Sequence, residues 1–376
     1  MNKLLWLVVA IVGALCFGYL ALQNGETVSA MYLVVAAVCI YMIAYRFYGR
    51  FIAYKVLELD KNRATPAMIH DDGRDYVPTN RSVLFGHHFA AIAGAGPLVG
   101  PILAAQMGYL PSMLWILVGG VFAGAVHDFV VLFISSRRDG RSLGEIIKDE
   151  LGTFTGAVTM IAIFGIMLII IAILSMVVVK ALAESPWGLF TIAMTIPIAI
   201  FMGIYMRYLR PGKVGEASVI GFVLLLLAIH YGSIIAADPV WAARFTFDAP
   251  TLAIIMMAYG FIAAVLPVWF LLAPRDYLST FLKIGVIGLM AIAIVIVAPD
   301  IQMPKTNPQY FDGTGPVFAG AIFPFLFITI ACGAISGFHA LISSGTSPKM
   351  LENETHALPV GYGSMLMESA VAIMAL

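Results

Sequence analysis

The chain has 376 residues, of which 61% are apolar and 11% are charged, and its formal net charge is zero. An ordinary soluble domain is about 45–50% apolar and about 25% charged, so this composition excludes a disordered chain and a conventional soluble enzyme. Because 21 basic and 21 acidic residues cancel, no net positive field is available and no nucleic-acid partner is expected. The mean hydropathy of +0.97 instead indicates a protein that crosses the lipid bilayer many times.

Long apolar runs recur along the sequence. A helix needs about 20 mostly apolar residues to cross a hydrocarbon core about 30 Å thick, and ten runs meet that length. Membrane-barrel strands are short and alternate in polarity, so we predict an all-α polytopic bundle. The ten predicted spans are 4–22, 30–48, 86–106, 112–135, 155–182, 187–207, 216–236, 251–272, 279–298 and 317–344.

The end of the sequence begins a further span. An eleventh apolar run starts near Gly361 and is still apolar at Leu376. Natural proteins seldom end partway through a membrane, so we expect residues 1–376 to be one transmembrane domain that is truncated at its C-terminus. The largest polar stretch, residues 50–85, is expected to be a cytoplasmic loop.

Basic residues lie mostly on one side of the predicted spans. If the N-terminus is inside, 18 of the 21 Lys and Arg residues fall in cytoplasmic segments, and only Lys180, Arg244 and Lys305 fall outside. Cytoplasmic loops of membrane proteins carry such an excess of Lys and Arg. The sequence therefore predicts a cytoplasmic N-terminus.

The third predicted span is a poor continuous helix. It holds three glycines and two prolines within eight residues, at Gly94, Gly96, Pro97, Gly100 and Pro101. Proline removes a backbone donor and clashes with the preceding turn, and an interior glycine costs about 1 kcal/mol relative to alanine. We therefore predict a broken helix near 94–101.

The tenth predicted span shows a similar pattern, and we predict a second break near 333–345. Irregular backbone at membrane depth is tolerated where it is buried in protein or lines a watery cavity. Secondary transporters use broken helices whose half-helix N-termini face anionic substrate groups. The alternative is that the small residues only let neighbouring helices pack closely. On the transporter interpretation, the substrate contacts Gly94, Gly96, Gly100, Ser343, Ser344 and Gly345.

Several titratable residues lie inside predicted spans. Asp128 is eight or nine residues before Arg137, hence roughly 12 Å below the inner boundary at about 1.5 Å per residue. Such an acidic group is costly in a membrane and usually faces a cavity or a partner, although a purely structural partner would also satisfy it. Because histidine titrates near neutrality, we predict a proton relay, with candidate members Asp128, His127, His339, Glu368, His87 and His88. Adjacent histidines point about 100° apart on a regular helix, so His87 and His88 are not expected to face one site together.

A metal site is not expected from the spacing of these residues. Zinc and iron favour imidazole and carboxylate ligands, but the sequence has no H-x-x-x-H or H-x-x-E-H motif. No cofactor motif is present either, and we predict neither a metal nor a cofactor. The three cysteines lie far apart in apolar runs and are interpreted as small buried hydrophobes, at Cys16, Cys39 and Cys332.

Four segments match a known pattern at length. They are FGHHFAAIAGAGPLVGPILAAQMGYLP, GAVHDFVVLFISSRRDGRSLGE, LLAPRDYLSTFLKIG and FPFLFITIACGAISGFHALISSGTSPKML. They resemble the carbon starvation protein A family, and the resemblance runs from the second predicted span to MLMESAVAIMAL. It implies a secondary transporter of the bacterial inner membrane, associated with peptide uptake during carbon starvation and with proton-coupled pyruvate import. It also implies a full protein considerably longer than this chain.

The residues and the resemblance together predict a proton symporter that imports a small carboxylate. Pyruvate is the first choice and short peptides are the second, because both carry a carboxylate that a half-helix N-terminus can hold. A membrane sensor that binds the nutrient without moving it is the second alternative. A membrane-embedded enzyme would need a clustered nucleophile or a metal motif, and a channel would need a ring of like charge or a filter repeat.

Overall fold

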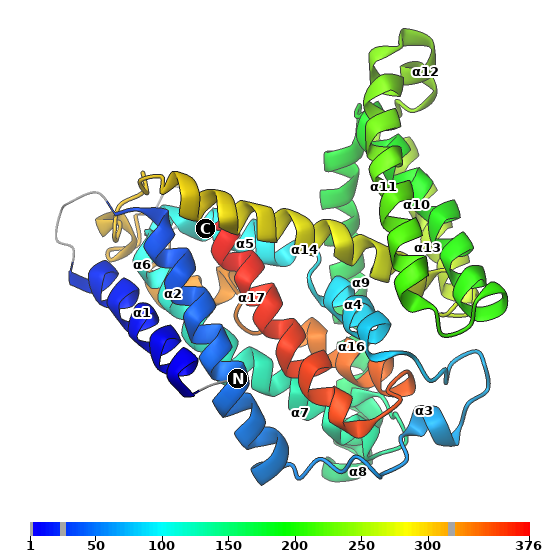
Figure 1. Cartoon of the computed structure of the whole chain (residues 1–376), viewed down its shortest axis with the longest axis horizontal. Helices are drawn as coiled ribbons and strands as arrows, with labels where there is room; N and C mark the ends of the chain where they lie inside the picture. Colours follow the sequence, from blue (N-terminus) through cyan, green and yellow to red (C-terminus); the bar gives the residue numbers. More distant parts are fainter. Residues whose placement is uncertain (1–2, 23–27, 315–319) are drawn as a thin grey trace.

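The computed structural model describes residues 3–22, 28–314 and 320–376, and this part of the chain consists of helices joined by loops (Figure 1). It contains no β-strand, only isolated backbone bridges from Ser29 to Asp300 and from Thr79 to Leu351. Residues 317–319, where the tenth predicted span begins, lie outside the described residues. The prediction of an all-α polytopic bundle is confirmed.

The chain begins with two apolar helices that pack side by side, α1 (Lys3–Leu22) and α2 (Ala30–Ile43) (Figure 1, blue). The side chain of Ser29 caps α2 by accepting a hydrogen bond from the backbone N–H of Met31. Helical turns then continue to Val56. The predicted polar loop is therefore shorter than expected, and it contains the short helix α3 (Pro66–Ile69).

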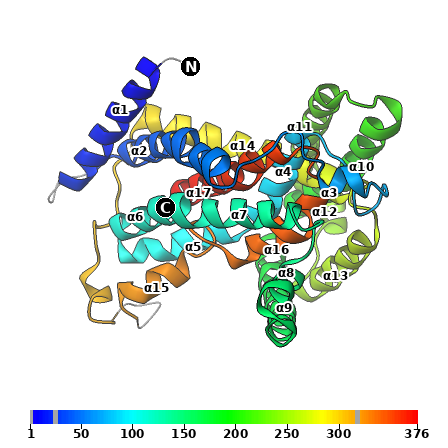
Figure 2. The same ribbon diagram turned by 90° about the horizontal axis from the view of Figure 1, so that it is seen from below.

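The central part of the molecule is built around one buried helix, α17 (Ser364–Ala375). Figure 2 shows it between α14 (Leu272–Val297) on one side and α7 (Ala125–Ser136) on the other, and it packs against both. The helices around it come from distant parts of the chain, which is why most side chains of α17 are buried. The central helices that precede it in the sequence are α4 (Arg81–Ile92), α5 (Gly96–Ala104), α6 (Tyr109–Gly119), α7 (Ala125–Ser136), α8 (Leu143–Leu151), α15 (Ile322–Thr329) and α16 (Gly337–Gly345).

A second group of helices stands away from this centre (Figure 1, green). Most large apolar side chains of its first helix are exposed, for example Phe154 at 83% and Ile161 at 74%. An exposed apolar surface of this size suits lipid or another protein surface. The group comprises α9 (Thr153–Leu182), α10 (Pro186–Ile204), α11 (Val214–Ala237), α12 (Pro239–Arg244) and α13 (Ala249–Val265). The next helix, α14 (Leu272–Val297), returns along the centre and packs on α4 and α2.

Among the described residues, seven helices are long and apolar enough to cross a membrane, or eight if the bent pair α4–α5 counts as one span. The predicted number of ten is not confirmed. The first and eighth predicted spans correspond to shorter apolar helices, Leu4–Leu20 and Ala249–Val265. The predicted eleventh run is part of a helical segment that extends from Glu354 to Ala375.

Both predicted helix breaks are present, but each begins before its predicted range and overlaps only the N-terminal part of that range. The first break, residues 93–95, separates α4 from α5, which are bent by 45°. The second break, residues 330–336, separates α15 from α16. Pro97 lies in the first turn of α5, where its missing N–H would have had no helical partner, so residues 96–101 remain helical. Residues 337–345 are helical as well.

Candidate functional site

The two helix breaks lie against each other. A Cβ atom at Gly96 would be 2.6 Å from Sγ of Cys332, and one at Gly100 would be 2.5 Å from the carbonyl oxygen of Thr329. Only glycine allows the backbone of α5 to come this close to the second break. A Cβ atom at Gly94, by contrast, would have no neighbour within 4 Å. Gly96 and Gly100 are therefore packing glycines, whereas the backbone at Gly94 faces open space.

An open cavity lies where the two breaks meet α9. Its volume is about 430 Å³, which is within the range of about 300–1,000 Å³ typical of small-molecule sites. Its walls are mainly apolar, and backbone from both breaks contributes to them. The predicted residues Gly96 and Gly100 line it, together with Ala95, Thr329 and Cys332.

Both half-helices that follow the breaks begin without a capping side chain. The N-cap residue of α5 is Ala95 and that of α16 is Ser336, and neither makes a side-chain capping bond. The first turn of a helix leaves backbone N–H groups without helical partners. Such groups, together with the helix dipole, favour an anion. A carboxylate is therefore a suitable ligand for these two helix ends.

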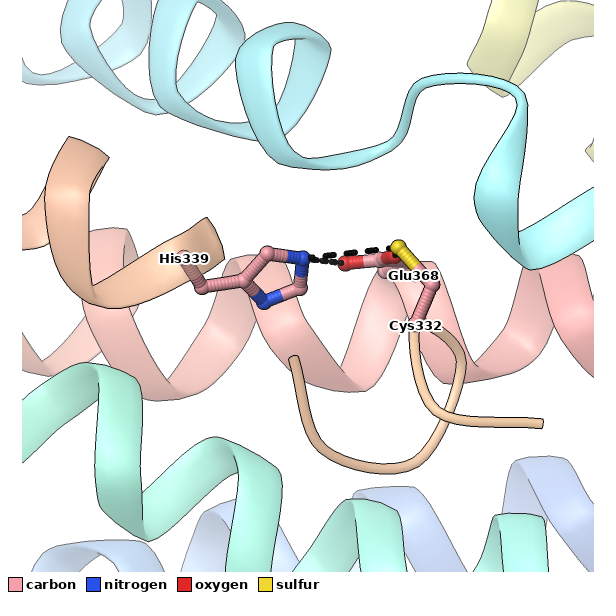
Figure 3. Close-up of side chains that lie close together, drawn as sticks. All are labelled: Cys332, His339 and Glu368. Carbon is pink, nitrogen blue, oxygen red and sulfur yellow. Dashed lines mark hydrogen bonds and ion pairs between the residues drawn. The ribbon is translucent and has the colours of Figure 1, made fainter. Parts of the chain in front are cut away.

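A chain of buried polar side chains crosses the centre of the molecule beside the breaks. It joins Asp128 of α7, His339 of α16 and Glu368 of α17, all fully buried. Nδ1 of His339 is hydrogen-bonded to Oδ2 of Asp128 at 2.8 Å, and its Nε2 lies 3.0 Å from Oε2 of Glu368. Figure 3 shows the imidazole pointing at the Glu368 carboxylate. The second contact has the distance of an ion pair but not the alignment of a hydrogen bond.

This chain reaches less buried groups at both ends. At one end, Nδ1 of His127 is 2.9 Å from Oδ1 of Asp128, and the His127 side chain is 29% exposed. At the other end, the thiol of Cys332 donates to Oε1 of Glu368 at 3.2 Å, and Cys332 lines the cavity. From the sequence, we interpreted Cys332 only as a small buried hydrophobe and did not predict that it belongs to the site. This chain of buried polar groups thus extends from the cavity at Cys332 to a partly exposed histidine, and the His339–Glu368 contact is its one step without hydrogen-bond alignment.

Comparison with known protein families shows which proteins this chain is similar to. A family model described as "Carbon starvation protein CstA" matches residues 29–376, which is most of the chain. The chain belongs to the CstA family. No solved structure matches it.

Named CstA-family relatives are similar over the whole length of the chain. It is 86% identical over 375 residues to "Peptide transporter CstA" of Campylobacter jejuni, covering 100% of this chain and 53% of the relative. It is 63% identical over 380 residues to "Peptide transporter CstA" of Escherichia coli, covering 100% and 54%. It is 62% identical over 371 residues to "Pyruvate/proton symporter BtsT" of Escherichia coli, covering 99% and 52%. The chain thus spans about half the length of these relatives.

Two further histidines of this CstA-family chain are buried but have separate partners. Nδ1 of His87 lies 2.9 Å from Oδ2 of Asp276 in α14, and Nδ1 of His88 is 2.6 Å from Oγ of Ser347. The two rings diverge, as their adjacent positions on a helix predict.

The predicted substrate residues of the second break are not brought to the cavity. Ser343, Ser344 and Gly345 occupy the C-terminal end of α16, whereas the break precedes its N-terminal end. The Ser344 hydroxyl donates to the carbonyl of Ala340 and accepts from the backbone N–H of Leu143. The Ser343 hydroxyl is buried and has no hydrogen-bond partner among the described residues. We had grouped Ser343, Ser344 and Gly345 with the glycines of the break because these residues are close in sequence. In the structure, helix α16 carries the three residues away from the break.

Lys283 is a second site residue that the sequence did not single out. Its Nζ donates to the carbonyl oxygens of Ala90 at 2.8 Å and Ala93 at 2.7 Å. A positive charge at the C-terminal end of a helix is favourable, so Lys283 holds the end of α4 where the first break begins. The predicted span 279–298 placed this residue near the cytoplasmic boundary. The helix in fact starts earlier, at Leu272, and Lys283 lies near its middle.

Proposed function

We propose that this chain carries the substrate site and the proton-coupling groups of a secondary active transporter that imports a small carboxylate with protons. The observation that supports the proposal most strongly is the meeting of two helix breaks at a cavity that borders a buried file of carboxylates and imidazoles. Broken helices beside an intramembrane ionisable group are the recurrent arrangement of such transporters. Relatives named as transporters support the same class of function.

The substrate is proposed to bind with its carboxylate toward the uncapped N-termini of α5 and α16. Ala95 and Gly96 line the cavity directly after the open backbone of Gly94, and the apolar cavity wall offers a surface for a short hydrocarbon group. Pyruvate, which combines a carboxylate with a methyl group, is our first choice. A relative named as a pyruvate/proton symporter supports this choice. Short peptides are the alternative, since other relatives are named peptide transporters.

The coupled proton is proposed to travel along the buried file. A proton taken up at His127 reaches Asp128, and His339 can pass it from there to Glu368, which borders the cavity through Cys332. Imidazole is suited to this step because it can hold a proton on either ring nitrogen and titrates near neutral pH. The proposal includes a bacterial inner-membrane location with a cytoplasmic N-terminus, which the distribution of Lys and Arg supports.

Uptake by the full-length protein tests this proposal. In proteoliposomes with an inward proton gradient, radiolabelled pyruvate should accumulate against its concentration gradient, and a protonophore should abolish the accumulation. Accumulation of di- or tripeptides without pyruvate uptake would change the substrate but keep the transporter. Saturable binding of either substrate without any uptake would replace the transporter by a sensor.

The role of Asp128 is tested in the same vesicles. Asp128→Asn keeps the size of the side chain but removes the ionisable group, so we expect it to abolish uphill uptake while exchange of labelled for unlabelled substrate continues. Asp312→Asn is the matched control, because Asp312 lies exposed in a loop. Normal uphill uptake by Asp128→Asn would remove Asp128 from the coupling mechanism.

A further inference from the structure

Cys332, His339 and Glu368 bring a thiol, an imidazole and a carboxylate to one point beside the second break (Figure 3). Their ligand atoms all lie within 4.8 Å of one another. We propose that these three residues, the metal triad, bind a divalent cation of the zinc type. Thiolate, imidazole and carboxylate are the ligands that Zn²⁺ and its softer relative Cd²⁺ prefer.

The distances within the metal triad are close to those of a tetrahedral site. With Zn–S near 2.3 Å and Zn–N or Zn–O near 2.0–2.2 Å, neighbouring ligand atoms are about 3.4–3.6 Å apart. In this structure Sγ of Cys332 is 3.9 Å from Nε2 of His339 and 3.2 Å from Oε1 of Glu368. Nε2 of His339 is 3.0 Å from Oε2 of Glu368. Shifts of a few tenths of an ångström therefore suffice to coordinate a cation.

Asp128 orients the imidazole of His339 for metal binding. A metal-binding histidine usually donates its other ring N–H to a carboxylate, which fixes the tautomer and turns the free lone pair toward the metal. Nδ1 of His339 is 2.8 Å from the Asp128 carboxylate, and Nε2 faces the thiol and Glu368. With its proton on Nδ1, His339 would present Nε2 as an electron-pair donor, which is the form that the cation requires.

The site also has a route of entry. His339 and Glu368 are fully buried, but Cys332 is partly exposed and lines the open cavity between the breaks. A cation that enters the cavity meets the sulfur first. Binding displaces the thiol proton to solvent and leaves one coordination position for water or for a ligand in the cavity.

Occupancy would tie the second break to α16 and α17. Cys332 lies in the break, whereas His339 and Glu368 lie on these two helices. The cation would also occupy groups to which we assign the coupled proton. We therefore expect Zn²⁺ to inhibit uptake, and only this inhibition rests on the proposed function. Binding itself does not depend on any transport activity.

Cd²⁺ binding to the purified full-length protein in detergent tests the proposal directly, because cadmium bound to thiolate gives an ultraviolet charge-transfer band. Wild-type protein should show the band with one cation per chain, and Cys332→Ser should lose that signal. Cys39→Ser is the matched control, because Cys39 packs against Gly13 away from the triad. Asp128→Asn should keep the band but weaken Cd²⁺ affinity by about 10–100-fold, the usual cost of losing the partner of a ligating histidine. A band of equal intensity in Cys332→Ser would overturn the proposal.

A second measurement needs no variant. Zn²⁺ should protect Cys332 of the wild-type protein from a small maleimide, as read by mass spectrometry of the Cys332 peptide, while Mg²⁺ should not. Equal labelling with and without Zn²⁺ would overturn the site even if Cys332→Ser failed to fold. Protection without any inhibition of uptake would keep the metal site and count against the triad as proton carrier.

Discussion

The two helix breaks meet at one cavity, but they are held in different ways. The first break, residues 93–95, contains no titratable side chain, and the ammonium group of Lys283 donates to one carbonyl oxygen of α4, that of Ala90, and to one in the break, that of Ala93. The second break, residues 330–336, is longer and has a thiol within it and a buried imidazole and carboxylate beside it. Both are followed by a half-helix without a capping side chain.

From this difference we infer that the first break orients the substrate and the second break responds to the coupled proton. A break held by backbone contacts and one fixed cation offers a constant surface on which a substrate can be oriented. If the groups around the second break carry the coupled proton as proposed, the charge of this break changes with their protonation and its conformation can follow. Substitutions that act on one break only can therefore separate packing, substrate binding and proton coupling.

The largest effect on stability is expected at the second break. His339→Ala leaves the buried carboxylates of Asp128 and Glu368 without their shared partner, and removing one member of a buried ionic contact costs about 3–5 kcal/mol. We expect a clear fall in the thermal unfolding temperature of the full-length protein in detergent. His230→Ala, at an exposed histidine, should change stability by less than about 0.5 kcal/mol. Equal effects of the two variants would mean that the buried chain contributes nothing to stability.

A smaller loss is expected at the first break. Lys283→Met keeps most of the side-chain volume but leaves the carbonyls of Ala90 and Ala93 without their donor, which costs about 1–3 kcal/mol for a buried group. Thermal unfolding should show this loss, whereas Lys213→Met, at an exposed residue, should show none. A Lys283→Met variant as stable as Lys213→Met would mean that packing alone holds the first break.

The helical class of the fold and the two helix breaks could be predicted from local sequence. The length of an apolar run and the clustering of Gly and Pro are properties of one helix and need no knowledge of its neighbours. Asp128, His127, His339 and Glu368 were predicted together from their rarity inside a membrane, and the structure brings them into one chain. The number of spans was harder to predict, since short apolar helices and broken ones have the same composition as complete spans.

The remaining parts of the site depend on contacts between distant segments. Cys332 looked like any small apolar residue, and only its neighbours on α16 and α17 give it a polar role. Lys283 was misplaced because an error of one to two turns in a helix boundary changes the depth of every residue in it. Ser343 to Gly345 were grouped with the glycines because sequence spacing cannot show that a helix carries them away from the break.

The smallest effect on stability is expected at Gly94, and comparison with Gly100 shows why. At Gly100 a Cβ atom would meet the backbone carbonyl of Thr329 at 2.5 Å, so Gly100→Ala should cost about 1–3 kcal/mol through overpacking. At Gly94 the added methyl meets no atom within 4 Å, so Gly94→Ala should change stability by no more than about 0.5 kcal/mol. If the substrate carboxylate approaches this backbone, Gly94→Ala should nevertheless raise the KM for uptake. An unchanged KM in a stable Gly94→Ala protein would place the substrate elsewhere and leave the first break with a structural role only.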